Sequence, residues 1–361
     1  MLVSRCARSP ALKFPLKIWI CHLFSLACVG EIQLNKLMKD NILNCGLTFL
    51  LLLFSGCIKD EPEEVYLEGE PIAGVGIFFP LGFYDADPLM PKISPDGEKL
   101  LFCASAGLPE WEGLWVMDLE TQERTLLYRE GRYGDWSPNG EWIAFNIGTQ
   151  IYKARKDGSE LTQLTFEGRN FLPDWSPDGS LILYNNTSCG SQIDPIPENS
   201  CGVLTMDSNT NEKKLIVSFV GTPKWFPSQD KFLTSGGEIF NLDGLKIYRL
   251  SLEEGYRSAD INLIDERIIM SNSGGILVMN SNGEGLKRII PSHLYGPHWR
   301  DDPEIYSACP SWHPDGKHIV YEHFEITRSK QLSDETHVEG YIRFYKVNVD
   351  SALKISNLSS Y

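Results

Sequence analysis

The histidines of this chain gather in one stretch near the C-terminus. Six of the seven lie between residues 293 and 337, with acidic side chains among them. Neutral imidazole and carboxylate groups are ligands that zinc and manganese accept. The candidates for such a site are His293, His298, His323 and His337. No His-x-x-x-His or Cys-x-x-Cys spacing accompanies them, so we predict no cofactor and keep a bound divalent cation as the alternative.

Aromatic and charged side chains lie close to these histidines in the sequence. Together they could hold a peptide or a sugar ring, or they could simply pack against their neighbours. The candidates for binding a partner protein or glycan are Trp111, Tyr295, His298, Trp299, Arg300, Asp301 and His323.

Motifs for catalysis are missing from the sequence. There is no Gly-x-Ser-x-Gly elbow, no phosphate-binding loop and no dinucleotide fingerprint. We therefore expect a binding module and not an enzyme. The alternative is a metal-dependent lyase or hydrolase of acidic saccharides that uses the histidine cluster.

The overall charge restricts the partners. The 361 residues carry a net charge of -15, which would repel a phosphate backbone and excludes nucleic acid. Apolar residues make up 42% of the chain and charged residues 22%, as in globular proteins. We expect a monomer.

The strands that must position these candidate residues are predicted from a sequence repeat. An aromatic or apolar residue, a tight turn that begins with proline and an apolar run recur, with prolines at 95, 138, 177, 227 and 314. The turn reads Pro-Asp-Gly at three of these prolines, Pro-Asn-Gly at 138 and Pro-Ser-Gln at 227, and we call all five Pro-Asp-Gly turns. A degenerate copy has Leu263 at the proline position. Proline and glycine suit the two central conformations of a tight turn, and the flanking apolar runs predict paired strands. Six repeats of about 45 residues, each with four strands, predict an all-β six-bladed propeller of antiparallel blades.

The phrase Trp175-Ser-Pro-Asp-Gly179 with its following apolar run resembles the TolB-like β-propeller repeat, a WD40-like family, over about residues 84–361. TolB proteins also have an α/β domain, for which the sequence between Cys57 and Ile93 leaves no room. The partner-binding role of TolB is therefore not carried over.

The N-terminal part predicts export. An apolar run at 47–54 is too short to span a bilayer and ends in Ser55-Gly56-Cys57, as in a secretory signal. This ending resembles the lipobox of prokaryotic lipoproteins and implies a lipid on Cys57. We expect an upstream extension and signal peptide at 1–56, with Met38 as an alternative start, an acidic tether and lead-in at 57–83, and the propeller at 84–361. The protein would then be exported and anchored to the bilayer at the periplasmic or outer surface of a prokaryotic cell.

The alternation of strands divides the propeller into two faces. The Pro-Asp-Gly turns lie on one, which we call the turn face, and the longest connections lie on the other, the loop face. These connections are 103–113, 185–202, 290–310 and 322–340. Because long loops often carry binding groups, we expect the unknown protein or glycan on the loop face.

The cysteines and three aspartates allow further predictions about disulfides and hydrogen bonds. Disulfides are conceivable between Cys189 and Cys201 and between Cys103 and Cys309, although all four could be buried thiols. Asp135, Asp174 and Asp260 each precede the last apolar residue of a first strand. They could bind a cation in the channel, but we favour hydrogen bonds to amides of the adjacent turn. The last blade is expected to end in an outer strand near Leu358, or else to gain a strand from 74–79.

Overall fold

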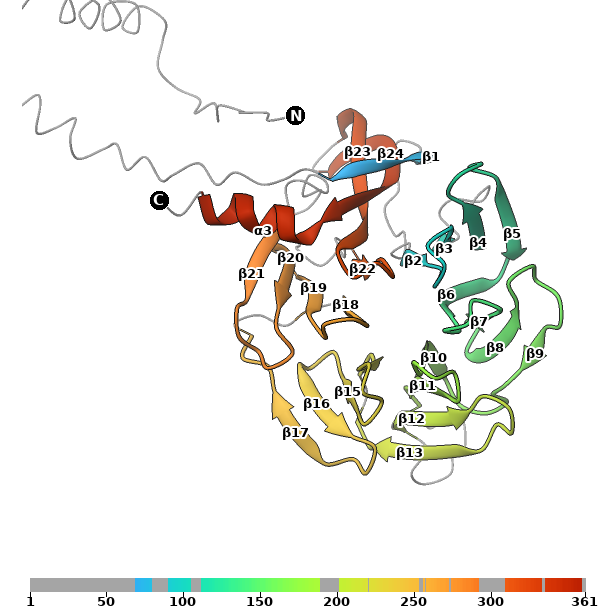
Figure 1. Ribbon diagram of the computed structural model, residues 1–361. Coiled ribbons are helices and arrows are strands. Elements are labelled where there is room, and N and C mark those ends of the chain that lie inside the picture. The colour runs from blue at the N-terminus through green and yellow to red at the C-terminus, as the bar shows by residue number, and fades with distance from the viewer. Residues whose placement is uncertain are drawn as a thin grey trace, which may run out of the picture. The chain divides into compact units, whose positions relative to one another are not determined.

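The computed structural model describes residues 69–79, 90–104, 112–188, 201–219, 221–252, 256, 258–272, 274–291, 309–332 and 335–358. Within these residues the strands form six antiparallel sheets of four strands each, arranged as blades around a central axis (Figure 1). The predicted six-bladed propeller is therefore confirmed.

Blades one to five each use four consecutive strands, and the first strand of each blade lies nearest the axis. Blade one comprises β2 (Lys92–Ile93), β3 (Lys99–Ala104), β4 (Gly113–Asp118) and β5 (Arg124–Tyr128). Blade two comprises β6 (Gly131–Trp136), β7 (Trp142–Ile147), β8 (Gln150–Arg155) and β9 (Thr162–Gln163). Blade three comprises β10 (Asn170–Trp175), β11 (Leu181–Asn186), β12 (Gly202–Asp207) and β13 (Lys213–Val217).

The next two blades have shorter strands. Blade four comprises β14 (Lys224–Trp225), β15 (Lys231–Leu233), β16 (Glu238–Asn241) and β17 (Lys246–Arg249). Blade five comprises β18 (Ser258–Ile261), β19 (Ile268–Asn272), β20 (Gly275–Met279) and β21 (Lys287–Pro291). Blade five contains the degenerate repeat, so the count of six derived from the sequence is correct.

Each Pro-Asp-Gly turn is closed by its own residues. In blade three the amide of Gly179 donates to the carbonyl of Ser176 at 2.8 Å, and the Ser176 hydroxyl donates to Asp178 at 2.7 Å. Gly179 has a φ of +76°, which glycine adopts without the steric cost that a Cβ brings. The turn chemistry therefore fixes the register of the two strands that it joins.

The hydrophobic core lies between neighbouring blades. Trp136 and Phe145 of blade two, for example, are buried with Leu101 of blade one. Where the ring closes, the Phe102 ring of blade one lies against Phe344 of blade six, with centroids 5.2 Å apart. A chain of this length thus builds several small cores around an axis, which avoids the need for one large core.

The sixth blade closes the ring with a strand from the other end of the sequence. Its sheet order is β1 (Glu70–Phe79), β24 (Glu335–Asn348), β23 (His318–Leu332) and β22 (Ser311–Trp312). Figure 1 shows the blue β1 beside the red β24. The second of the two predicted closures is therefore correct, and the propeller includes residues 70–79 that we had assigned to the lead-in.

The C-terminal segment is a helix and not the expected outer strand. Helix α3 (Val349–Leu358) begins after Asn348, whose side-chain oxygen accepts the amide hydrogen of Ser351 at 2.9 Å and so caps the helix. Val349 and Ala352 are buried against the cluster between blades five and six. The outer-strand position is already filled by β1, so these residues pack elsewhere. Within the described residues, no helix has the length and apolar character needed to cross a membrane.

The predicted loop at 322–340 is also different in the structure. Strands β23 and β24 run through it as a hairpin, with pairing that continues from His318–Asn348 to Leu332–Glu335. The strands of this hairpin extend beyond the length used by the other blades (Figure 1).

Strand β1 should be essential for stability. A chain that starts at residue 80 leaves the β24 edge unpaired, whereas one that starts at residue 69 keeps all four strands. We expect the melting temperature of the shorter chain, followed by circular dichroism, to fall by roughly 5–10 °C, because a loss of a few kcal/mol gives shifts of this size. Its exposed edge should also promote association, visible by size-exclusion chromatography. Equal melting temperatures for the two truncated chains would contradict this closure.

Candidate functional site

One residue in each innermost strand lines the central channel. It stands directly before the Trp or Ile that ends the strand, and we call its place the ring position. The ring positions of blades one to six are Lys92, Asp135, Asp174, Lys224, Asp260 and Ser311. All six line a cavity of about 230 Å³, which we call the central cavity. Because the prolines of four turns also line it, the central cavity lies at the turn face.

A repeated backbone feature precedes the ring position. Met90, Tyr133, Leu172 and Cys309 each stand two residues before it and have positive φ angles of 47°, 54°, 58° and 32°. In blades two and three the left-handed residue lies in a β-bulge, a feature that bends a strand and re-aims the side chains that follow. These left-handed positions carry no glycine and so could not be recognised from the sequence.

The ring carboxylates connect neighbouring blades. Asp135 accepts a hydrogen bond from the backbone amide of Trp175 at 2.9 Å. Asp174 accepts one from the amide of Trp225 at 2.8 Å. Asp260 accepts from the amide of Trp312 at 2.8 Å and from the hydroxyl of Ser311 at 2.9 Å. We had favoured bonds to the adjacent turn. The structure instead gives each carboxylate an amide of the next blade, because the innermost strands run side by side around the axis.

Two ring lysines, which the sequence analysis did not single out, pair with two of these carboxylates. Lys224 Nζ lies 2.5 Å from Asp174 Oδ1, and Lys92 Nζ lies 2.9 Å from Asp260 Oδ1. Burial favours a low pKa for Lys224, but the ring carboxylates, Asp174 foremost, outweigh it and raise the pKa above its usual value. Burial likewise acts to raise the pKa of Asp260, while the charge of Lys92 lowers it overall. Lys224 and Asp260 therefore keep their charges at neutral pH. The lysines could have been found by comparing the residue before the apolar anchor in every repeat.

The rim of the central cavity is apolar and accessible. Leu263 lines the cavity and is 62% exposed, and its neighbour Ile264 is 68% exposed. By contrast, the four tryptophans of the cavity wall are each no more than 8% exposed. These two adjacent aliphatic side chains lie where a molecule bound in the central cavity would cover them.

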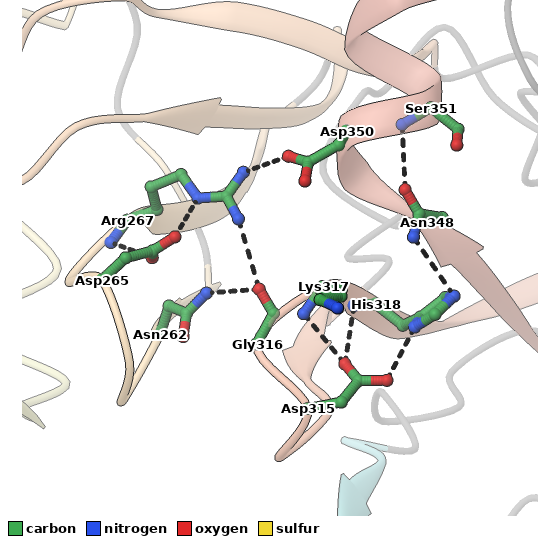
Figure 2. A network of polar contacts seen from close by, with 10 residues as sticks. All are labelled: Asn262, Asp265, Arg267, Asp315, Gly316, Lys317, His318, Asn348, Asp350 and Ser351. Atoms are coloured by element: carbon green, nitrogen blue, oxygen red, sulfur yellow. Dashed lines mark hydrogen bonds and ion pairs between the residues drawn. The ribbon is translucent and has the colours of Figure 1, made fainter.

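A polar network holds this rim in place (Figure 2). The Arg267 guanidinium contacts Asp350 of α3 at 2.9 Å and donates to the carbonyl of Gly316 at 3.2 Å. The same carbonyl accepts from the Asn262 side chain at 2.8 Å. These contacts tie the blade-five turn, which carries Leu263 and Ile264, to blade six.

A second part of the network lies in the blade-six turn, where Figure 2 shows the Asp315 carboxylate between its neighbours. His318 Nδ1 lies 2.7 Å from Asp315 Oδ2. Burial acts to raise the pKa of Asp315, but the backbone amides of Lys317 and His318 and the His318 ring lower it well below its usual range. His313, on the cavity wall, has a pKa lowered by burial and by Lys346.

Most of the loop-face candidates lie outside the described residues, namely Trp111, His293, Tyr295, His298, Trp299, Arg300 and Asp301. The predicted lipid site Cys57 and the disulfide candidate Cys189 also lie outside them. His323 lies on β23 opposite Arg343, and its ring lies against that of Tyr345, with centroids 4.6 Å apart and the planes tilted by 56°. His337 lies on β24 opposite Lys330. Both histidines are thus on strands and not in the loop that we expected.

The structure bears on some of the predicted metal ligands and disulfides. In the described part of the chain, no group of three or more His, Cys, Asp or Glu side chains could hold a metal ion. Cys103 and Cys309 are buried thiols, so the structure does not form the bridge suggested between them. A buried thiol packs as a small apolar side chain. Cys201 is disulfide-bonded, while Cys189, its suggested partner, lies outside the described residues.

Sequence comparisons place the chain among distant relatives. No protein-family model matches it. It is 27% identical to an uncharacterized protein of Agrobacterium fabrum in an alignment of 154 residues that covers 38% of this chain and 51% of that protein. It is 30% identical to a TolB homolog of Chlorobium luteolum in an alignment of 110 residues that covers 28% of this chain and 24% of the homolog. The chain therefore spans about half or less of the length of these relatives.

Solved structures resemble the chain only partly. An oligogalacturonate lyase in complex with manganese has a TM-score of 0.47 and 15% identity, covering 78% of this chain and all of that one. TolB from Acinetobacter baumannii has a TM-score of 0.46 and 17% identity, covering 70% of this chain and 64% of that one. Both TM-scores are below 0.5, and neither likeness supports a conclusion about fold or activity.

The ring charge of Asp135 should be visible in the pH dependence of stability. Burial, followed by the charge of Asp174, raises the pKa of Asp135 to about 6. Protonated Asp135 therefore stabilises the fold fully below about pH 4, the pKa of an aspartate in the unfolded chain. This stabilisation is lost as the pH rises through about 6. Asp135→Asn should leave stability at pH 3.5 almost unchanged and raise it at pH 7 by on the order of 1–3 kcal/mol relative to the native protein.

Urea unfolding at a series of pH values measures this difference. The matched control is Asp243→Asn, which removes an exposed charge in a turn of blade four and should give the native pH profile. If the free energy of unfolding of Asp135→Asn varied with pH as that of the native protein does, ionised Asp135 would not destabilise the fold.

Proposed function

We propose that the protein is exported, is held to a membrane by a lipid on Cys57, and binds a partner protein through the turn face of its propeller. It would act as a binding module and not as an enzyme. The observation that carries the proposal is the central cavity, with its charged wall and the exposed Leu263 and Ile264 at its rim. Our expectation from loop lengths pointed to the loop face, but this cavity lies at the turn face.

The rim favours a protein over a glycan. Sugar rings stack on exposed aromatic faces, whereas Trp136, Trp175, Trp225 and Trp312 are between 4% and 8% exposed. The accessible side chains are aliphatic and suit an apolar residue of a protein partner. Covering both would contribute about 2–4 kcal/mol, on the scale of 25 cal/mol per Å² of apolar surface.

Export and anchoring are supported by the sequence alone. The apolar run that ends at Cys57 is typical of a lipoprotein signal, and the similarity to a TolB homolog agrees with a place in the cell envelope.

The anchor has a direct test in cell fractions. In a bacterial host, the native protein should sediment with membranes at its processed size, and Cys57→Ser should be soluble or remain an unprocessed precursor. Metabolic labelling with a fatty acid should mark the native protein and not the variant. If Cys57→Ser were processed and labelled like the native protein, the lipid anchor would be disproved.

The docking surface has a separate test. Envelope extract of the source cells is passed over immobilised protein, and the amount of the captured partner is compared between Leu263→Asp and Leu245→Asp. Leu245 is 66% exposed in the outer turn of blade four and serves as the matched control. Leu263→Asp should reduce capture at least tenfold, because about 1.4 kcal/mol of lost contact has that effect.

Undiminished capture by Leu263→Asp would exclude the turn face as the docking surface. If a saccharide were retained in a Leu263-dependent manner in place of a protein, the partner class would be wrong.

A further inference from the structure

The charges of the central cavity do not balance. Its wall carries three carboxylates, Asp135, Asp174 and Asp260, and two ammonium groups, Lys92 and Lys224. Each lysine is within 3 Å of one carboxylate, because Lys224 pairs with Asp174 and Lys92 with Asp260. One negative charge is therefore left over.

The carboxylate without a cation is Asp135. Its Oδ2 accepts the Trp175 amide at 2.9 Å, and among the described residues no Lys, Arg or His lies within 4.0 Å of it. Its second oxygen makes no hydrogen bond to a described residue. Since Asp135 lines the cavity, this oxygen can accept a hydrogen bond from a ligand bound there. A carboxylate removed from bulk water is stabilised strongly by a matching cation.

We propose that the central cavity binds the cationic end of a lysine or arginine side chain of the partner protein, paired with Asp135. This inference rests on the proposed function and specifies what the partner inserts. An incoming unit charge would bring the cavity wall to neutrality. The aliphatic stem of such a side chain would pass Leu263 at the rim, where it covers apolar surface while its head reaches the carboxylate.

The same charges discriminate against anions. A phosphate or carboxylate would bind to Lys92 and Lys224, but both lysines already form ion pairs with ring carboxylates. An anion would have to break an ion pair that is largely shielded from water and leave a carboxylate without its partner, which costs several kcal/mol. The cavity therefore selects cations although it contains two lysines.

Binding should strengthen with rising pH. Asp135 has a pKa of about 6, raised by burial and by Asp174 and opposed by Lys224 and Lys92. Asp260 and His313 complete the charged and titratable groups of the wall. Burial and Lys346 lower the pKa of His313, so it adds no positive charge at pH 7. Ionisation of Asp135 between pH 5 and pH 7 should increase the affinity for a cation about tenfold.

The test uses the full chain and a defined probe. The peptide acetyl-Gly-Lys-Gly-amide is titrated at pH 7.5 while tryptophan fluorescence is followed, since four tryptophans line the cavity. Acetyl-Gly-Gln-Gly-amide serves as the uncharged control. We expect saturable binding of the lysine peptide alone, at least tenfold weaker in Asp135→Asn and unchanged in Asp243→Asn.

Asp135→Asn keeps an oxygen that can accept the Trp175 amide, and circular dichroism checks that it folds. The native protein provides a second measurement, a tenfold gain in affinity from pH 5 to pH 7. Equal affinity of Asp135→Asn and native protein, absence of saturable binding, or a pH-independent affinity would each overturn the inference.

The two proposals can fail separately. If partner capture depends on Leu263 but the lysine peptide does not bind, the turn face is the docking surface and the cation site is wrong. If the peptide binds through Asp135 while Leu263→Asp captures the partner normally, the cation site is correct and the docking surface lies elsewhere.

Discussion

The bond between a ring carboxylate and the backbone amide of the next blade is the interaction on which this structure depends. Each blade is a small sheet that cannot bury its own faces, so it is stable only when its neighbours are held beside it. Asp135, Asp174 and Asp260 hold three of these junctions at the axis. Placing carboxylates there requires compensating cations, and Lys92 and Lys224 supply two of them. The stability of the ring and the charge of the channel thus have the same origin.

The repeat made most of the fold predictable. The Pro-Asp-Gly turn has a strong local signal because its residues determine both the backbone angles and the hydrogen bonds, as Ser176 and Gly179 show. Even the degenerate blade-five copy was found from its spacing. Closure by β1 and the helix at Val349–Leu358 were harder, since they depend on which of two segments fills one edge. Local sequence does not decide such a competition between distant segments.

The site was predicted less well, and for a physical reason. Histidines and exposed aromatics attract attention because their chemistry is versatile, whereas Lys92 and Lys224 look like ordinary surface lysines in the sequence. Only the sixfold arrangement brings the ring positions together across blades that are about 40 residues apart. The left-handed residues Tyr133 and Leu172, which shape the strands before Asp135 and Asp174, were equally invisible. Loop length led us to the loop face, but the cavity formed by described residues lies at the turn face.

Docking of the partner at the turn face can be examined in intact cells by site-specific photo-crosslinking. A photoreactive residue at position 263, on the rim, is compared with one at position 149, which is exposed in the connection between β7 and β8 on the opposite face. If the partner docks at the turn face, position 263 should give a discrete crosslinked adduct and position 149 none. An adduct from position 149 alone would show that the partner docks on the opposite face.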